Sequence, residues 1–421
     1  MKIYQQILDE KFGDYFSLEN IAPKIIIRKL ESEGVELSDE QKQHIKSEIE
    51  RGKLEDLKLS LDPEKVPADM VSLDPSGNRG ITINLDESGL FIKELAEHLE
   101  NRLSDIIEKI VEYTGNNITK RLRATQRKML KKRRRDNNGY ENQLFSKWHP
   151  ALDLLETMIV IANEVGAHYN YEFRDSSQVG KENTIEVITR LHARACQIAS
   201  EILVLLKSGF ADGAHARWRS LHEVVVIQFF IHSGGEELAQ KYLQHDIIES
   251  YKAATIYQRY YEDLGYEPLS NTEFNIMKTE YDNLLQKYGK NFAKQYGWAA
   301  DTIGNKNPSF RDIEEYVDMA HNRPFYKMAS NNIHANAKGV FLNLGIYPEG
   351  PDLLLTGPSF LGLVDAGQGT AISIYQSTVA LSVEPILDHL IICDILRRFM
   401  EDTEKAFINC NKKIEKEYRG G

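Results

Sequence analysis

The sequence predicts an all-α protein with an N-terminal helical module and a long amphipathic helix, followed by a large helical-bundle domain. Apolar residues recur at three- and four-residue steps along nearly the whole chain, which is the spacing of an amphipathic helix. Only the run from Ile81 to Leu85 alternates as a strand does. With 421 residues, 42% hydrophobic and 27% charged, the chain has the composition of a globular protein of about two or three domains.

Residues 1–60 are predicted to form a small module of about three helices. Its last helix begins at Ser38, and Gln41 follows at the spacing of a capping box. A proline- and glycine-rich break then opens residues 61–142, which hold a linker, a long helix and a basic segment. We place the main domain boundary at the polar residues Asp136–Asn142.

The long helix is expected from Ser88 to about Tyr113. Its apolar stripe is close to a coiled-coil seam, so we expect a homodimer. The stripe consists of Ile92, Leu95, Leu99, Leu103, Ile106, Ile110 and Tyr113.

Residues 143–410 are predicted to form the helical bundle, and residues 411–421 a tail. Glycines punctuate the helix ends, and Pro324 fits the first turn of its helix. The expected helices cover about 143–165, 183–208, 213–232, 236–263, 272–287, 309–320, 324–344 and 370–409.

The basic segment concentrates the positive charge of an acidic chain. The whole chain carries a net charge of −11 and this segment carries ten cations without an acid, so the rest sums to −21. Such a density of positive charge attracts RNA or DNA through counterion release. The alternative is that the segment contacts an acidic protein partner or the acidic remainder of its own chain. We expect no membrane binding, because no apolar face supports insertion. The predicted nucleic-acid-binding residues are Lys120, Arg121, Arg123, Arg127, Lys128, Lys131, Lys132, Arg133, Arg134 and Arg135.

The chain lacks the common motifs for cofactors, metals and nucleophiles. It contains no GxxxxGK[ST], GxGxxG, HExxH or GxSxG, so we expect no cofactor and no metal. The weaker alternative is a metal site built from His245 and Glu249 with His222 or Glu223.

We expect a cytoplasmic protein. The three cysteines lie far apart and form no CxxC, which favours a reducing compartment. The N-terminus lacks the apolar region of a signal peptide. The most apolar late stretch is interrupted by Glu384, Asp388 and Asp394, which excludes a membrane span there.

Two groups of polar residues interrupt otherwise apolar helices. In the first, His215, Arg219 and His222 share one helical stripe, with Glu223 one turn beyond Arg219. Polar groups that enter a buried helix need partners or a function. The alternative to function is an Arg219–Glu223 pair that stabilises helix packing.

The second group lies on the helix expected at 324–344 and its first turn. Arg323, Tyr326, Ser330 and His334 follow one another at steps of three, four and four, so they would share one side of that helix. An imidazole beside hydroxyls and cations suits proton transfer next to a phosphate. A buried, hydrogen-bonded His–Ser–Tyr array is the structural alternative.

These motifs resemble a bacterial family of helical proteins catalogued as a domain of unknown function. The resemblance spans about residues 145–408, and its motifs are GFADGAHARWRSLHE, YGWAAD, RPFYKMASNNIHANAKG and GPSFLGLVDAGQGTAIS. It implies a helical domain whose polar residues serve a purpose, and it implies no particular reaction.

A helix with polar residues before a late histidine also resembles the HEPN group of bacterial helical ribonucleases. That resemblance implies metal-independent attack of an RNA 2′-hydroxyl on its phosphate, in stress or phage defence. The group carries Arg-x4–6-His, whereas the only cation at that spacing before His334 is Lys327, so Arg219 would supply the missing arginine.

The resemblance then implies a role for each candidate residue. His334 is the general acid/base, Arg219 and Arg323 stabilise the phosphate, Glu223 orients Arg219, and Tyr326 and Ser330 position the substrate. The competing interpretation is a non-catalytic helical scaffold that binds nucleic acid or an acidic partner through the basic segment.

Overall fold

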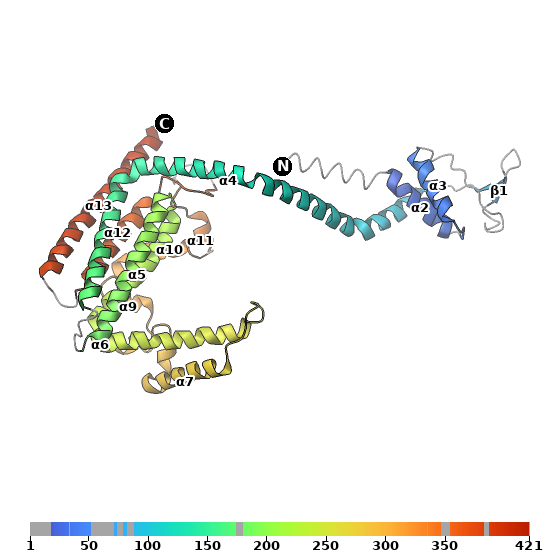
Figure 1. Ribbon diagram of the computed structural model, residues 1–421. Helices are drawn as coiled ribbons and strands as arrows, with labels where there is room; N and C mark the ends of the chain where they lie inside the picture. Colours follow the sequence, from blue (N-terminus) through green and yellow to red (C-terminus); the bar gives the residue numbers. More distant parts are fainter. Residues whose placement is uncertain are drawn as a thin grey trace. The chain divides into compact units, whose positions relative to one another are not determined.

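The computed structural model is all-α, as predicted, and divides into two compact units, Met1–Arg134 and Arg135–Gly421 (Figure 1). Among the described residues, the strands are β1 (Val71–Leu73) and β2 (Arg79–Ile81), which pair as an antiparallel hairpin. Of the predicted strand Ile81–Leu85, only Ile81 is described. The structure describes residues 18–32, 34–51, 71–73, 79–81, 88–173, 180–334, 336–346, 354–382 and 387–420.

The first unit contains a small helical module. Helices α2 (Leu18–Ser32) and α3 (Asp39–Glu50) pack around a cluster of aliphatic side chains. The predicted capping box at the start of α3 is confirmed: the Gln41 amide donates to Ser38 Oγ at 3.3 Å, and the Ser38 amide donates to Gln41 Oε1 at 2.8 Å. The cluster consists of Ala22, Ile26, Leu30, Val35, Ile45 and Ile49.

Helix α4 (Ser88–Phe173) is much longer than predicted. It continues through the basic segment and through Asp136–Asn142, so the predicted break there was wrong. The residues of Asp136–Asn142 have low helix propensity, but propensity contributes little free energy. The burial of Leu144 and Trp148, which follow directly on the same helix, outweighs it. Of the predicted coiled-coil stripe, the described side chains are Ile110, which is buried, and Tyr113, which is exposed.

The bundle in the second unit is built around α5 (Glu182–Lys207) and α6 (Ala211–Tyr260), which lie side by side (Figure 1). Gly209, with φ of 78°, lies in the tight turn between them. Gly235 interrupts α6 with φ of 66° and ψ of −155°, so α6 consists of two helical segments, close to the two helices predicted at 213–232 and 236–263.

The bundle is completed by α12 (Leu363–Val379) and α13 (Leu387–Gly420), which share its core with the C-terminal part of α4. The prediction of a single helix over residues 370–409 was wrong, because two helices cover this part of the chain. Pro385 lies in the sequence between the two observed helices, and proline disfavours a helical conformation of the residue before it.

The segment that follows α6 forms one longer helix and a series of short elements, several of which contact α6. Helix α7 (Asn271–Tyr288) matches the helix predicted at 272–287. The remaining elements are η2 (Lys290–Ala293), η3 (Gly297–Ala299), α8 (Ala300–Ile303), α9 (Phe310–Tyr316), η4 (Ala320–Asn322), α10 (Arg323–Asn331) and α11 (Ala337–Phe341). Within the described part of the chain, no helix is both long and apolar enough to cross a bilayer.

Small residues on α12 allow neighbouring helices to approach closely. A Cβ atom added at Gly367 would lie 2.2 Å from the ring of Phe407, and one at Gly369 would lie 2.6 Å from Trp218 Nε1. The Trp218 indole also donates a hydrogen bond to Ser373 Oγ at 3.3 Å. The position of Trp218, and with it the segment of α6 that carries the polar residues, therefore depends on α12.

We predict that Gly367→Ala lowers the free energy of unfolding by about 1–3 kcal/mol, because the added methyl group displaces the fully buried Phe407 ring. Urea denaturation followed by circular dichroism measures the loss. Gly213→Ala is the matched control, since its Cβ would lie 3.6 Å from the nearest atom. There alanine favours the helix by about 0.5–1 kcal/mol. Equal effects of the two substitutions would contradict the packing argument.

Candidate functional site

Arg219, Glu223 and Tyr326 form one hydrogen-bonded cluster between α6 and α10. Arg219 donates from Nε to Glu223 Oε1 at 3.1 Å and from Nη2 to the Tyr326 hydroxyl at 2.9 Å. The Tyr326 hydroxyl in turn donates to Glu223 Oε1 at 2.5 Å. The three polar groups therefore meet at Glu223 Oε1, and the cluster joins two helices about a hundred residues apart in sequence.

The ring of Tyr326 lies among cationic and aromatic side chains. The guanidinium carbon of Arg219 is 4.6 Å from the ring centroid, and that of Arg323 is 5.7 Å from it. The rings of Phe310 and His222 lie at centroid distances of 5.3 and 5.9 Å. Burial, together with the hydrogen bond to the Glu223 carboxylate, raises the pKa of Tyr326, so its hydroxyl is a proton donor at neutral pH.

A buried carboxylate, Glu314 on α9, lies beside this cluster. Its side chain is completely buried, and Oε1 is 3.0 Å from His222 Nε2 while Oε2 accepts from Arg323 Nη1. An unpaired carboxylate at such a position is very unfavourable, and these two partners compensate its desolvation. No pattern in the sequence distinguishes this residue, because a glutamate in the mostly polar stretch Arg311–Tyr316 is typical of a solvated helix face.

The helix predicted at 324–344 was wrong, and His334 does not lie on α10. That helix ends at Asn331, His334 is exposed in the turn that follows, and α11 begins at Ala337. Asn336 caps α11 by accepting from the Gly339 amide at 2.7 Å, a role that asparagine favours over a helix interior. The alignment of His334 with Arg323, Tyr326 and Ser330 on one helical face was therefore wrong.

Ser330 is on α10, but its hydroxyl donates to the Tyr326 carbonyl of its own helix at 2.8 Å. His334 lines a pocket of about 380 Å³ at the end of α10. Asp212 and the amide side chains of Asn331, Asn332 and Asn343 contribute to the same pocket. The Asp212 carboxylate accepts from the Leu344 amide at 3.1 Å, and burial raises its pKa. Glu223 does not line this pocket, so the structure separates His334 from the Arg219–Glu223–Tyr326 cluster.

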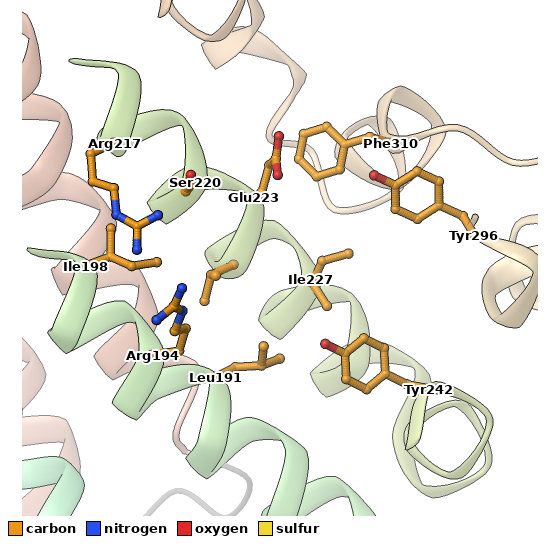
Figure 2. A pocket seen from close by; sticks show the side chains of 11 residues that line it. Leu191, Arg194, Ile198, Arg217, Ser220, Glu223, Ile227, Tyr242, Tyr296 and Phe310 are labelled. Atoms are coloured by element: carbon orange, nitrogen blue, oxygen red, sulfur yellow. The ribbon is translucent and has the colours of Figure 1, made fainter. Parts of the chain in front are cut away.

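Glu223 lines a second pocket, of about 260 Å³, between α5, α6 and the segment that leads into α9 (Figure 2). Its polar lining consists of Arg194, Arg217, Ser220, Glu223, Tyr242 and Tyr296. Burial and the charge of Glu223 raise the pKa of Tyr296 to about 12. Sequence inspection missed this pocket, because its residues come from three separate segments and form no motif.

The alternative metal site is not assembled among the described residues. His245 lies within hydrogen-bonding distance of the Lys294 carbonyl, at 2.9 Å, and 4.0 Å from Glu249, while His222 pairs with Glu314. The described part of the chain holds no group of three or more His, Cys, Asp or Glu side chains placed to bind a metal ion.

The ten cations of the basic segment all lie on α4, and all are exposed. None forms an ion pair with another described residue. At about 100° per residue, all except Arg133 fall within an arc of about 180° around the helix. Leu122 and Met129 lie on the opposite side, with exposed fractions of 51% and 56%. The sequence was sufficient to predict the concentration of positive charge. Because the helix is uninterrupted, nearly all of this charge lies on one side of it.

Residues 185–346 match the model of a family of unknown function (DUF5677). The match confirms the resemblance to a family of unknown function, over a shorter stretch than the 145–408 expected from the motifs. No curated protein and no solved structure matches the chain. Both groups of candidate residues on α6 and α10 lie within the matched segment, whereas the basic segment lies outside it.

His215, from the first polar group, is completely buried and stacks on Trp218 at a centroid distance of 5.6 Å. Neither ring nitrogen has a hydrogen-bond partner among the described residues. Burial lowers the pKa of His215 from 6.5 to about 4, so the folded protein holds the ring neutral.

We predict that His215 contributes to acid denaturation. The unfolded chain binds its proton below about pH 6.5 and the folded chain only near pH 4, so stability falls as the pH is lowered through this window. The loss approaches about 3 kcal/mol near pH 4. His215→Phe removes this component, and urea denaturation from pH 7 to pH 4 measures the smaller loss. His232→Phe, an exposed position on the same helix, should retain the wild-type profile.

Proposed function

We propose that this protein binds nucleic acid through the cationic face of α4. The observation that carries the proposal is the set of ten exposed cations between Lys120 and Arg135, unpaired among the described residues and gathered almost entirely on one half of a continuous helix. At about 1.5 Å per residue this face is about 24 Å long. Duplex DNA offers one phosphate per about 1.7 Å of axis, so several phosphates lie within its reach.

The charge arrangement favours nucleic acid over a membrane surface. An interfacial helix needs a broad apolar face for insertion, whereas the side of α4 opposite the cations presents Leu122 and Met129 among polar residues. An acidic protein is the alternative partner, and the binding experiment below distinguishes it. The proposed setting is the bacterial cytoplasm, where cysteines remain reduced; the three cysteines are free in the structure.

We expect that replacing four lysines of the cationic face by glutamine weakens binding to single-stranded RNA and to duplex DNA. Fluorescence anisotropy as a function of salt concentration measures both affinity and salt dependence. Each lost phosphate contact should reduce the slope of log K against log salt by about 0.9 for duplex DNA and about 0.7 for single strands. The four positions are Lys120, Lys128, Lys131 and Lys132.

A matched control removes the same charge from another helix. Replacing four exposed lysines of α13 by glutamine also lowers the net charge from −11 by four, to −15, and should leave binding unchanged. Equal weakening by both variants, or wild-type binding without salt dependence, would refute a specific α4 interface. Binding of acidic polypeptide in place of nucleic acid would identify the alternative partner. The control positions are Lys405, Lys412, Lys413 and Lys416.

We further propose that the pocket at His334 cleaves RNA without a metal. The supporting observation is an exposed imidazole on a pocket of about 380 Å³ that Asn331, Asn332 and Asn343 also line. His334 would take the proton of the 2′-hydroxyl as its oxygen attacks the adjoining phosphorus. The bond from phosphorus to the 5′-oxygen then breaks, and the protonated His334 returns the proton to that oxygen, leaving a 2′,3′-cyclic phosphate and a free 5′-hydroxyl.

In this second proposal the partly buried cluster of Arg219, Glu223 and Tyr326 positions the turn that carries His334. Arg219, Glu223 and Tyr326 bind one another, and Arg323 binds Glu314, so these side chains hold α10 in place. Ser330 is likewise engaged with its own helix. Stabilisation of phosphate charge by Arg219 or Arg323, as expected from the sequence, would require these contacts to open.

We predict that the wild-type protein cleaves labelled single-stranded RNA in the presence of a chelator, and that His334→Ala reduces the rate at least about a hundredfold. Gel analysis of the 5′-labelled products measures the rate. His321→Ala, an exposed histidine just before α10, is the control and should cleave as the wild type does. Absence of cleavage by the wild type, or unchanged cleavage by His334→Ala, would leave the non-catalytic binding protein as the function.

A further inference from the structure

The pocket that Glu223 lines has two chemically different sides. Arg194 projects from α5 and Arg217 from α6, and together they give one side a positive charge (Figure 2). Tyr296 and Phe310 come from the segment outside α6 and Tyr242 from the second half of α6, giving an aromatic side. A ligand that fits both sides must combine an anionic group with a flat ring.

Both arginines keep donors for an anion. Arg194 forms no ion pair among the described residues, and its one hydrogen bond there runs from Nη1 to Gln197 Oε1 at 2.8 Å. Arg217 is paired through Nε with Glu201, which leaves the other guanidinium N–H groups unassigned. Since a guanidinium carries five N–H donors and suits bidentate contact with phosphate, the two side chains can hold one phosphate group.

Unpartnered polar atoms line the remainder of the pocket. The hydroxyls of Ser220 and Tyr242 have no hydrogen-bond partner among the described residues. Oxygen Oε1 of Glu223 accepts from both Arg219 and Tyr326, whereas Oε2 has no partner in the described part of the chain. A free carboxylate oxygen accepts hydrogen bonds from sugar hydroxyls or from an exocyclic amine.

The geometry points to a binding site for a single nucleoside monophosphate, with its phosphate on Arg194 and Arg217, its base against the aromatic side, and its hydroxyls toward Glu223 Oε2. The volume of about 260 Å³ lies just below the range of about 300–1,000 Å³ that is typical of small-molecule pockets, so the site holds no more than one nucleotide. Aromatic side chains stack on every base, and the site therefore carries no strong base preference.

This site is separate from the two surfaces proposed above. All of its lining residues lie between Leu191 and Phe310, within the segment that matches the family model, whereas the cationic face of α4 lies outside that segment. His334 lines the other pocket. The inference therefore stands whether or not α4 binds nucleic acid and whether or not His334 cleaves RNA.

Isothermal titration of the full-length protein with AMP, UMP, adenosine and inorganic phosphate tests the proposal. We expect both mononucleotides to bind at least about tenfold more tightly than either adenosine or phosphate alone, because each fragment makes half of the contacts. Equal affinity for phosphate and AMP, equal affinity for adenosine and AMP, or no binding of mononucleotides would each overturn the proposal.

Two variants and two controls locate the site. Arg194→Gln should weaken AMP binding about tenfold or more, since a hydrogen bond to a charged group is lost. Tyr242→Phe should weaken it less and retain the fold, because only a hydroxyl is removed. Arg190→Gln, one turn earlier on α5 and outside the pocket, should bind AMP as the wild type does, and so should the variant with four substituted lysines on α4. Unchanged affinity in Arg194→Gln, or loss in the α4 variant, would overturn the assignment.

Discussion

The region around the candidate site depends on the buried carboxylate of Glu314. A charge without solvent must be compensated locally, and here His222 from α6 and Arg323 from α10 provide the compensation. Glu314 itself lies on α9, so α9 and α10, which follow each other closely in sequence, meet α6, 92 residues away, at one pair of oxygen atoms. Tyr326 then packs against His222 and Arg323, and its hydroxyl joins the Arg219–Glu223 pair. The position of each polar side chain in this network therefore depends on its contact with the next one.

The same network explains why two cavities lie beside it and not inside it. Glu223 gives Oε1 to the network and presents its remaining surface to the smaller pocket, while the end of α10 leads into the turn of His334. The side chains of the network therefore fill the space between one another, and the two pockets open beside the network. Rigid internal contacts at the boundary of a pocket hold its polar atoms in place before a ligand arrives, which reduces the ordering that binding requires.

Periodicity in the sequence was sufficient to predict the helical class, helices α5 and α7, and the interruption of α6 near Gly235, because these follow from local spacing. The pairing of Arg219 with Glu223 also follows from a single helical turn. Two helix boundaries were predicted wrongly because other contacts outweigh local helix propensity. Helix α4 continues through weak helix formers because Trp148 is buried beyond them. Helix α10 ends before His334, and Asn336 caps the next helix. Glu314 and the pocket at Arg194 arise from contacts across long sequence separations, which no local pattern records.

Gly235 gives α6 a second role besides packing. Glu223 precedes this residue and Tyr242 follows it, so two segments of the same helix, which meet at one glycine with positive φ, both contribute side chains to one pocket. The position of Tyr242 relative to Glu223 consequently depends on one pair of backbone angles, whereas the chemistry of the pocket depends on side chains several residues away. A substitution at Gly235 can therefore move Tyr242 relative to Glu223 without changing either side chain, and a substitution of either side chain can change the chemistry of the pocket without moving the helix.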